Sequence, residues 1–143
     1  MSLILMNYFQ VMTIKHSLAH KQIYFVLALC WTLLVFLLCL VSTGSLPTLN
    51  IKVSGIDKFV HFTFHFVFVM LWFLYLKNSN IKSVLLKIFL GSFCFGVLIE
   101  ISQSLFTANR EGDILDVLAN ATGAITAITV LILYIKFFKK DIL

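Results

Sequence analysis

The sequence REGDILDVLANATG, residues 110–123, places a run of polar side chains at the start of a long apolar segment. Asp113, Asp116, Asn120 and Gly123 follow one another at intervals of three, four and three residues. At about 100° per residue they lie within roughly 80° of one helix face. The pattern predicts a helix with a polar stripe on its first turns, and this stripe is either a binding site or a seam packed against other helices.

The whole chain is too apolar for a water-soluble protein. Its 143 residues are 61% hydrophobic and 12% charged, with a mean hydropathy of +1.04, whereas soluble domains have roughly 45–50% apolar and 25% charged residues. The net charge of +5 comes from basic residues scattered among apolar segments, which is not the basic patch of a nucleic-acid-binding protein. Cys30, Cys39 and Cys94 lie singly in apolar runs, and from the cysteines we expect neither a disulfide nor a zinc site.

Four apolar segments are long enough to cross a bilayer as helices, which takes about 20 residues. They cover residues 23–41, 59–76, 83–106 and 113–138. The predicted fold class is therefore all-α, an integral membrane bundle of four transmembrane helices that forms one domain over residues 23–138. Residues 1–22 form an N-terminal arm, either a short interfacial helix or a mobile segment, and residues 139–143 form a C-terminal tail.

The distribution of basic residues predicts the orientation of the bundle. On one side of the predicted membrane domain lie eight of them: Lys15, Lys21, Lys77, Lys82, Lys87, Lys136, Lys139 and Lys140. On the other side lie Lys52, Lys58 and Arg110, which completes the total of 11. Because basic residues concentrate on the cytoplasmic side, we expect the arm and the tail, and hence both termini, in the cytoplasm.

Polar stripes enter three of the predicted helices from the same, extracytoplasmic end. Besides the stripe that opens the fourth helix, they consist of Asp57, His61 and His65 in the second and Glu100 and Gln103 in the third. At a rise of about 1.5 Å per residue, the middle of each stripe lies roughly 5–10 Å inside the membrane boundary. The stripes together predict a polar pocket that faces away from the cytoplasm.

The charges in this predicted pocket need partners. An isolated charge in hydrocarbon costs at least about 2.5–3.5 kcal/mol, so Glu100 and Asp116 are expected to face the other helices and not the lipid. Candidate partners are the two histidines, Lys58 and Arg110. The same side chains could instead join the helices without any further role, because buried polar residues form hydrogen bonds between membrane helices.

The residue types allow several kinds of chemistry. Asp57 and His61, or Asp113 and Asp116, have a spacing suited to binding Mg²⁺, Mn²⁺ or Zn²⁺, with Arg110 and Lys58 on a phosphate group. General acid–base chemistry by Glu100 or His61 is equally compatible with the pattern. No established metal signature such as HExxH is present. Catalytic residues, metal and cofactor therefore stay unassigned.

Three sequence blocks resemble the VanZ-like family of small bacterial membrane proteins. They are a DK-x-x-HF opening at residues 57–62, a G-x-x-x-E-x-x-Q helix at 96–103 and an R-x-x-D-x-x-D-x-x-x-N-x-x-G segment at 110–123. The resemblance covers about residues 25–138, so residues 1–22 lie outside it, and His65 is not one of the positions in its pattern. The matching positions are Asp57, Lys58, His61, Glu100, Gln103, Arg110, Asp113, Asp116, Asn120 and Gly123.

This resemblance implies a protein of the bacterial cell envelope, in the inner or plasma membrane. The family takes its name from a protein that gives low-level resistance to the glycopeptide teicoplanin, and it carries no catalytic assignment. The leading hypothesis is a protein that binds or acts on a lipid-linked or cell-wall glycan or phosphate group at the outer leaflet. The alternatives are a metal-assisted phosphotransferase or hydrolase on an envelope lipid, a small transporter and a structural subunit. Expected partners are membrane lipids and such a precursor, and no nucleic acid.

Overall fold

The computed structural model describes residues 3–40, 55–78, 83–106 and 113–138, with side chains from residue 18 onward, and this part of the chain forms helices without strands. The helices are α1 (Leu3–Leu40), α2 (Ile56–Leu76), α3 (Val84–Phe106) and α4 (Ile114–Phe138). All four contain a segment long and apolar enough to cross a membrane, Leu18–Leu40 in α1 and the full length of the others. The predicted all-α bundle of four transmembrane helices is confirmed.

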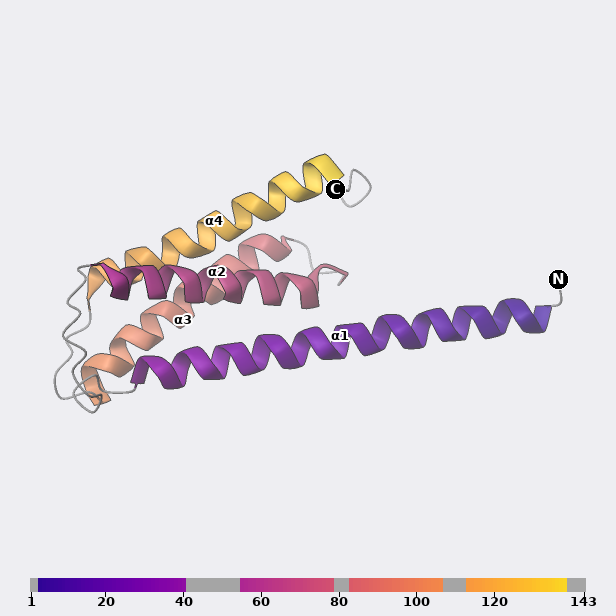
Figure 1. The fold of residues 1–143 in the computed structure, drawn as a ribbon, viewed down its shortest axis with the longest axis horizontal. Helices are drawn as coiled ribbons and strands as arrows, with labels where there is room; N and C mark the ends of the chain where they lie inside the picture. Colours follow the sequence, from indigo (N-terminus) through magenta and orange to yellow (C-terminus); the bar gives the residue numbers. More distant parts are fainter. Residues whose placement is uncertain (1–2, 41–54, 79–82, 107–112, 139–143) are drawn as a thin grey trace.

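Helix α1 begins far earlier than the predicted first span. The sequence analysis left residues 1–22 as an interfacial helix or an arm, but the helix is continuous from Leu3 to Leu40. These 22 residues contain neither glycine nor proline, so no residue in them breaks a helix. In Figure 1 the N-terminal half of α1 projects beyond the other three helices.

Helix α2 lies at the centre of the bundle. It packs against α1, α3 and most extensively α4, whereas α1 and α4 make no contact with each other in the described part of the chain. Helices adjacent in sequence run antiparallel, so the end of α1, the start of α2, the end of α3 and the start of α4 lie at the same end (Figure 1). We call it the 40/56 end, after the residues Leu40 and Ile56.

The opposite end of the bundle has aromatic and basic anchors. Lys21 of α1 lies 5.6 Å from the ring centroid of Tyr75, and Lys77, which follows α2, lies 5.7 Å from that of Tyr24 in α1. Tyrosine and lysine are typical of the boundary between hydrocarbon and headgroups. This pair of contacts therefore marks one edge of the apolar part of the bundle, close to the predicted start of the first span.

The middle of the bundle is packed with apolar side chains. We define its apolar core as the buried residues Phe68, Val69, Ile88, Ala124, Ala127 and Leu131. A smaller group, Val35, Cys39 and Ile99, joins α1 to α3. The outer surfaces of the helices expose many large apolar residues, including Leu37, Leu98 and Ile125, as a lipid-facing surface requires.

Two glycines allow the helices to approach closely near the 40/56 end. A Cβ atom on Gly123 of α4 would overlap the backbone carbonyl of Phe62 in α2. A Cβ atom on Gly96 of α3 would lie 2.9 Å from Nδ2 of Asn120 and 3.2 Å from Cε1 of His65. Small residues permit such backbone contact in membrane helices, and here they bring polar stripes from three helices together.

Candidate functional site

The buried polar side chains of the three stripes meet near the 40/56 end of the bundle. Those exposed by 6% or less include His61, Glu100, Gln103, Asp116 and Asn120. The expectation that Glu100 and Asp116 face the other helices is thereby confirmed. We call the set Asp57, Lys58, His61, Glu100, Asp113, Asp116 and Asn120 the polar cluster, because distances of 4.0 Å or less join its members.

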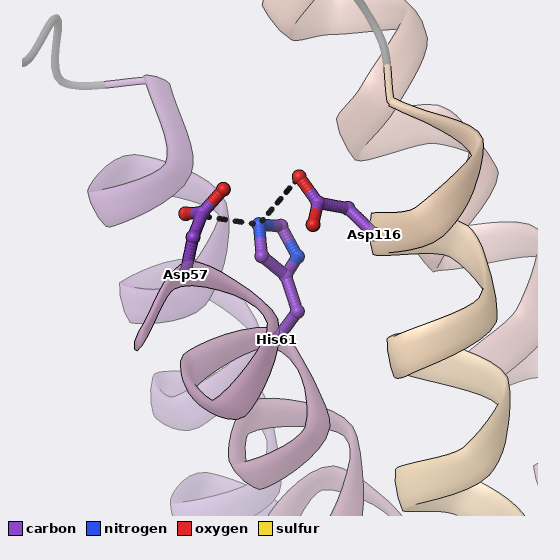
Figure 2. A group of neighbouring side chains, drawn as sticks. All are labelled: Asp57, His61 and Asp116. Carbon is purple, nitrogen blue, oxygen red and sulfur yellow. Dashed lines mark ion pairs between the residues drawn. The ribbon is translucent and has the colours of Figure 1, made fainter. Parts of the chain in front are cut away.

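His61 of α2 is at the centre of the polar cluster. Its Nδ1 atom lies 3.2 Å from Oδ1 of Asn120 and 3.8 Å from Oε1 of Glu100. Its Nε2 atom lies 3.7 Å from Oδ2 of Asp116 and 3.9 Å from Oδ1 of Asp57. Figure 2 shows the ring between these two carboxylates, one from its own helix and one from α4. One imidazole thus connects α2 with both α3 and α4.

Lys58 forms the outer layer of the cluster. Its Nζ atom lies 2.8 Å from Oδ2 of Asp113 and 3.0 Å from Oδ1 of Asp116. The side chains of Lys58 and Asp113 are 37% and 40% exposed, whereas that of Asp116 is only 4% exposed. Lys58 therefore spans from the rim to the interior, and it holds the buried carboxylate of Asp116 with one oxygen toward the ammonium and the other toward His61.

Asp113 immediately precedes helix α4 and caps its N-terminus. Its Oδ1 atom accepts a hydrogen bond of 2.8 Å from the backbone N–H of Leu115, and its carbonyl accepts bonds from the N–H groups of Asp116 and Val117. Aspartate is a favoured residue at this position because it satisfies otherwise unpaired N–H groups. Its own N–H donates to Oε2 of Glu100 at 3.2 Å. The hydrogen bond from Lys58, followed by that from Leu115, lowers the pKa of Asp113 below its ordinary value.

Gln103, a predicted member of the pocket, is oriented toward α1. Its Nε2 atom donates a hydrogen bond of 2.9 Å to the backbone carbonyl of Cys39. This carbonyl is near the C-terminus of α1, where the last turn of a helix leaves its carbonyl groups without partners in the helix. The bond gives Gln103 a role in attaching α1 to α3.

The sequence model described as VanZ/LLP1 matches residues 1–137. The chain belongs to the VanZ/LLP1 family. No curated protein and no solved structure matches the chain. The match begins at residue 1, so it is longer than the stretch of about 25–138 that the resemblance covered.

The three sequence blocks of this VanZ/LLP1 chain that resemble the family pattern converge in space. The first block supplies Asp57, Lys58 and His61, the second supplies Glu100, and the third supplies Asp113, Asp116 and Asn120. Gly123, also in the third block, provides the close contact with α2 that brings α4 near enough. Arg110, the remaining predicted site residue, lies outside the described residues.

Ser92, which was not among the predicted site residues, is the partner of His65. Its hydroxyl lies 2.8 Å from Nδ1 of His65, and both residues are buried, at 0% and 1% exposure. A signal was present, because Ser92, Gly96 and Glu100 follow at intervals of four residues and so share one face of α3. The pair extends the polar side chains one helical turn beyond His61, toward the middle of the bundle.

Below this pair the VanZ/LLP1 bundle is apolar. The rings of Phe68 and Phe95 lie 6.2 Å and 5.9 Å from that of His65, and 5.4 Å from each other. The apolar core continues from there. Within the described residues, the buried polar groups thus extend from the 40/56 end to mid-bundle and stop. Such an arrangement suits a ligand that enters and leaves at one end.

Three side chains of the polar cluster could hold a metal ion. One ligand atom from each of Asp57, His61 and Asp116 lies within 4.8 Å of the other two. Imidazole nitrogen and carboxylate oxygen are ligands of Zn²⁺ and Mn²⁺. Asp57 has a side chain 49% exposed, so the group can be reached from the rim.

Proposed function

We propose that this VanZ/LLP1 protein binds or acts on a lipid-linked or cell-wall glycan or phosphate group in the bacterial envelope, and thereby affects susceptibility to teicoplanin. The observation that carries the proposal is the polar cluster itself. It gathers charged side chains from three helices at one end of a bundle that is otherwise apolar. A lipid headgroup or a phosphate at the membrane surface would meet the bundle at this depth.

The energetics of the membrane support a functional role for the cluster. A charge buried in a membrane helix costs up to about 2.5–3.5 kcal/mol on insertion scales, a value that applies at the helix centre, and such residues commonly mark binding sites and ion paths. Helices α2, α3 and α4 are already joined by the close contacts at Gly96 and Gly123 and by the apolar core, which includes Ala124. Holding these helices together therefore does not require four carboxylates.

The proposed side of the membrane is extracytoplasmic, in the inner or plasma membrane. The excess of basic residues in segments 1–22, 77–87 and 136–140 supports cytoplasmic termini. The 40/56 end, with the polar cluster, would then face outward, where cell-wall precursors are used. Asp57, Lys58 and Asp113 are partly exposed at its rim, which gives such a precursor access.

A transport function has less support. A path for an ion or a proton needs polar groups or water through the whole membrane thickness. Beyond His65 and Ser92, the side chains described in the bundle interior form the apolar core. The same observation favours a ligand that stays on one side.

The test is genetic and chemical. Host cells that lack the gene would be complemented with wild type, Asp116→Asn or Glu100→Gln, and teicoplanin susceptibility and lipid-linked precursors would be measured. Thr122→Val is the matched control, because Thr122 is an exposed polar residue of α4 that bonds to the carbonyl of Ala119. We expect the two cluster variants to lose complementation and the control to keep it. Unchanged susceptibility and unchanged precursors, with the variants folded and abundant, would reject the proposal.

A further inference from the structure

We infer that Asp57, His61 and Asp116 bind a divalent transition-metal ion such as Zn²⁺. The inference rests on the proposed function, because it names what would let this acidic cluster accept a phosphate group. Four carboxylates, those of Asp57, Glu100, Asp113 and Asp116, surround Lys58 and His61 in the described part of the chain. Lys58 is already bonded to two of them, so a bound cation is the better attachment for an anionic ligand.

The proton on His61 is placed by its neighbours. Oδ1 of Asn120, 3.2 Å from Nδ1, can only accept a hydrogen bond. The carboxylate oxygen of Glu100 lies on the same side at 3.8 Å. Nδ1 therefore carries a hydrogen and donates it to Asn120, which leaves Nε2 as the ring atom that could bind an ion. In metal sites, a second hydrogen bond of this kind fixes which nitrogen of a histidine binds the ion.

Asn120 is held in the orientation that this requires. It is 2% exposed, and its Nδ2 atom has no hydrogen-bond partner among the described residues. Nδ2 lies beside Gly96, where even a Cβ atom would be only 2.9 Å away. Buried polar groups without a partner are rare, and many of those that occur adjoin a functional site, a water or an ion. The amide nitrogen of Asn120 thus points toward α3, and its oxygen points toward His61.

The Nε2 atom of His61 faces two carboxylate oxygens. They lie 3.7 Å away, on Asp116, and 3.9 Å away, on Asp57 (Figure 2). An N–H···O hydrogen bond would be about 2.7–3.2 Å long. Two ligands bound to one tetrahedral ion, each at about 2.0–2.2 Å, lie roughly 3.3–3.6 Å apart. The observed separations are therefore longer than hydrogen bonds and close to those of atoms that share an ion.

Oδ2 of Asp116 is the carboxylate oxygen that is free of Lys58 and directed toward His61, so it is the atom that would hold the ion. Lys58 binds Oδ1 of Asp116 at 3.0 Å, and this leaves Oδ2 directed toward His61. Zinc sites with three protein ligands keep a fourth position for water or substrate. Here that position would open toward Asp57, the most exposed of the three side chains, where a phosphate oxygen could complete the coordination.

Metal content tests the inference directly. Full-length protein in lipid nanodiscs would be stripped with a chelator, titrated with Zn²⁺, and separately loaded with Co²⁺ to record its visible absorption. We expect one Zn²⁺ per wild-type chain and Co²⁺ bands of a low-coordinate site. His61→Gln should abolish both, and Asp57→Asn should weaken Zn²⁺ binding by at least about tenfold.

Two further variants, Asp57→Asn and His20→Gln, make the experiment decisive. Asp57 is half-exposed at the rim, so Asp57→Asn tests the site even if His61→Gln does not fold. His20→Gln is the matched control for adventitious binding, because His20 is exposed on α1 beside Tyr24, at the end of the bundle opposite the cluster. No Zn²⁺ in wild type, or equal binding in Asp57→Asn, would overturn the inference and assign the geometry to an ion pair of protonated His61.

The same nanodiscs separate this inference from the proposed function. They would be prepared with and without a synthetic polyprenyl phosphate, and retention of this lipid would be measured. Zn²⁺ bound without lipid retention supports the metal site and rejects phosphate-lipid binding. Lipid retained without Zn²⁺ overturns the metal site and leaves the proposed function standing.

Discussion

Gly123 of α4 lies so close to Phe62 of α2 that a methyl group on its Cα would overlap the Phe62 carbonyl oxygen. His61, the residue before Phe62, contacts Asn120 and Asp116, which lie about one and two turns before Gly123 in α4. The contact between two backbones therefore sets the separation of the side chains that form the polar cluster. The packing of α2 against α4 and the geometry of the polar cluster therefore both depend on Gly123.

Gly123→Ala should push α2 and α4 apart. Because the obstacle is backbone, the structure cannot relax by moving a side chain, and we expect a loss of roughly 1–3 kcal/mol in the free energy of unfolding. Unfolding in mixed micelles, followed by circular dichroism, measures it. Gly91→Ala is the matched control, since nothing lies within 4 Å of a Cβ there. A Gly123 variant as stable as the Gly91 variant would contradict the described contact.

Asn120→Ala should weaken metal binding without removing a ligand. It deletes the acceptor of the His61 Nδ1 hydrogen, so the ring loses its orientation, and loss of such a partner typically lowers metal affinity about 10–100-fold. Asn120→Asp should tighten binding, because an anionic acceptor makes the imidazole a stronger ligand. Zn²⁺ titration of the two variants gives the comparison. Equal affinities in both would show that Asn120 does not act on His61.

Gln103→Leu should loosen α1 from α3. The substitution removes the hydrogen bond to the Cys39 carbonyl, and such bonds between membrane helices contribute about 0.6 kcal/mol on average and up to about 1.7 kcal/mol. We expect destabilisation in that range, together with faster proteolysis within α1. Gln22→Leu, at an exposed position of α1, controls for the change in polarity. Faster proteolysis confined to α4 would argue against the assigned role of Gln103.

The ion pair of Asp113 with Lys58 should make stability depend on pH in the acid range. The pKa of Asp113 is lowered in the folded protein, so this carboxylate stabilises the fold above its unfolded pKa of about 3.9. The contribution is lost as the pH falls through the lower, folded pKa. Thermal unfolding of wild type and Asp113→Asn, compared from pH 6 to pH 3, isolates it. Asparagine also begins helices well, so the difference should reflect charge and should shrink toward pH 3.

The helical period and the alternating direction of membrane-spanning helices allowed the sequence to predict which polar side chains lie at one end of the bundle. Asp57 and His61, or Asp116 and Asn120, are four residues apart, so each pair had to share a helix face. Antiparallel helices then brought the two pairs to one end of the bundle. Lys58, one of the proposed counter-ions, does bind two carboxylates.

The rotation of each helix about its axis was not available from the pattern. Gln103 shares a stripe with Glu100, yet the step of three residues rotates its side chain by roughly 60° around α3, and it bonds to α1. Ser92 is a single hydroxyl in an apolar run, and only the position of His65 on another helix gives it a partner. The sequence left open whether residues 1–22 form an interfacial helix or a mobile arm, because residues 3–22 mix polar and apolar side chains without a clear period.

The apolar core has an electrical consequence. A charge that crosses the whole membrane at 100 mV changes its energy by about 2.3 kcal/mol. An ion that reaches His61 from the 40/56 end passes only the rim, whereas most of the voltage falls across the low-dielectric layer around Phe68, Val69 and Leu131. Occupancy of the polar cluster should therefore be nearly independent of membrane potential. The protein would respond to the chemical composition of the fluid on one side of the membrane, and the bundle beneath would act as an insulator.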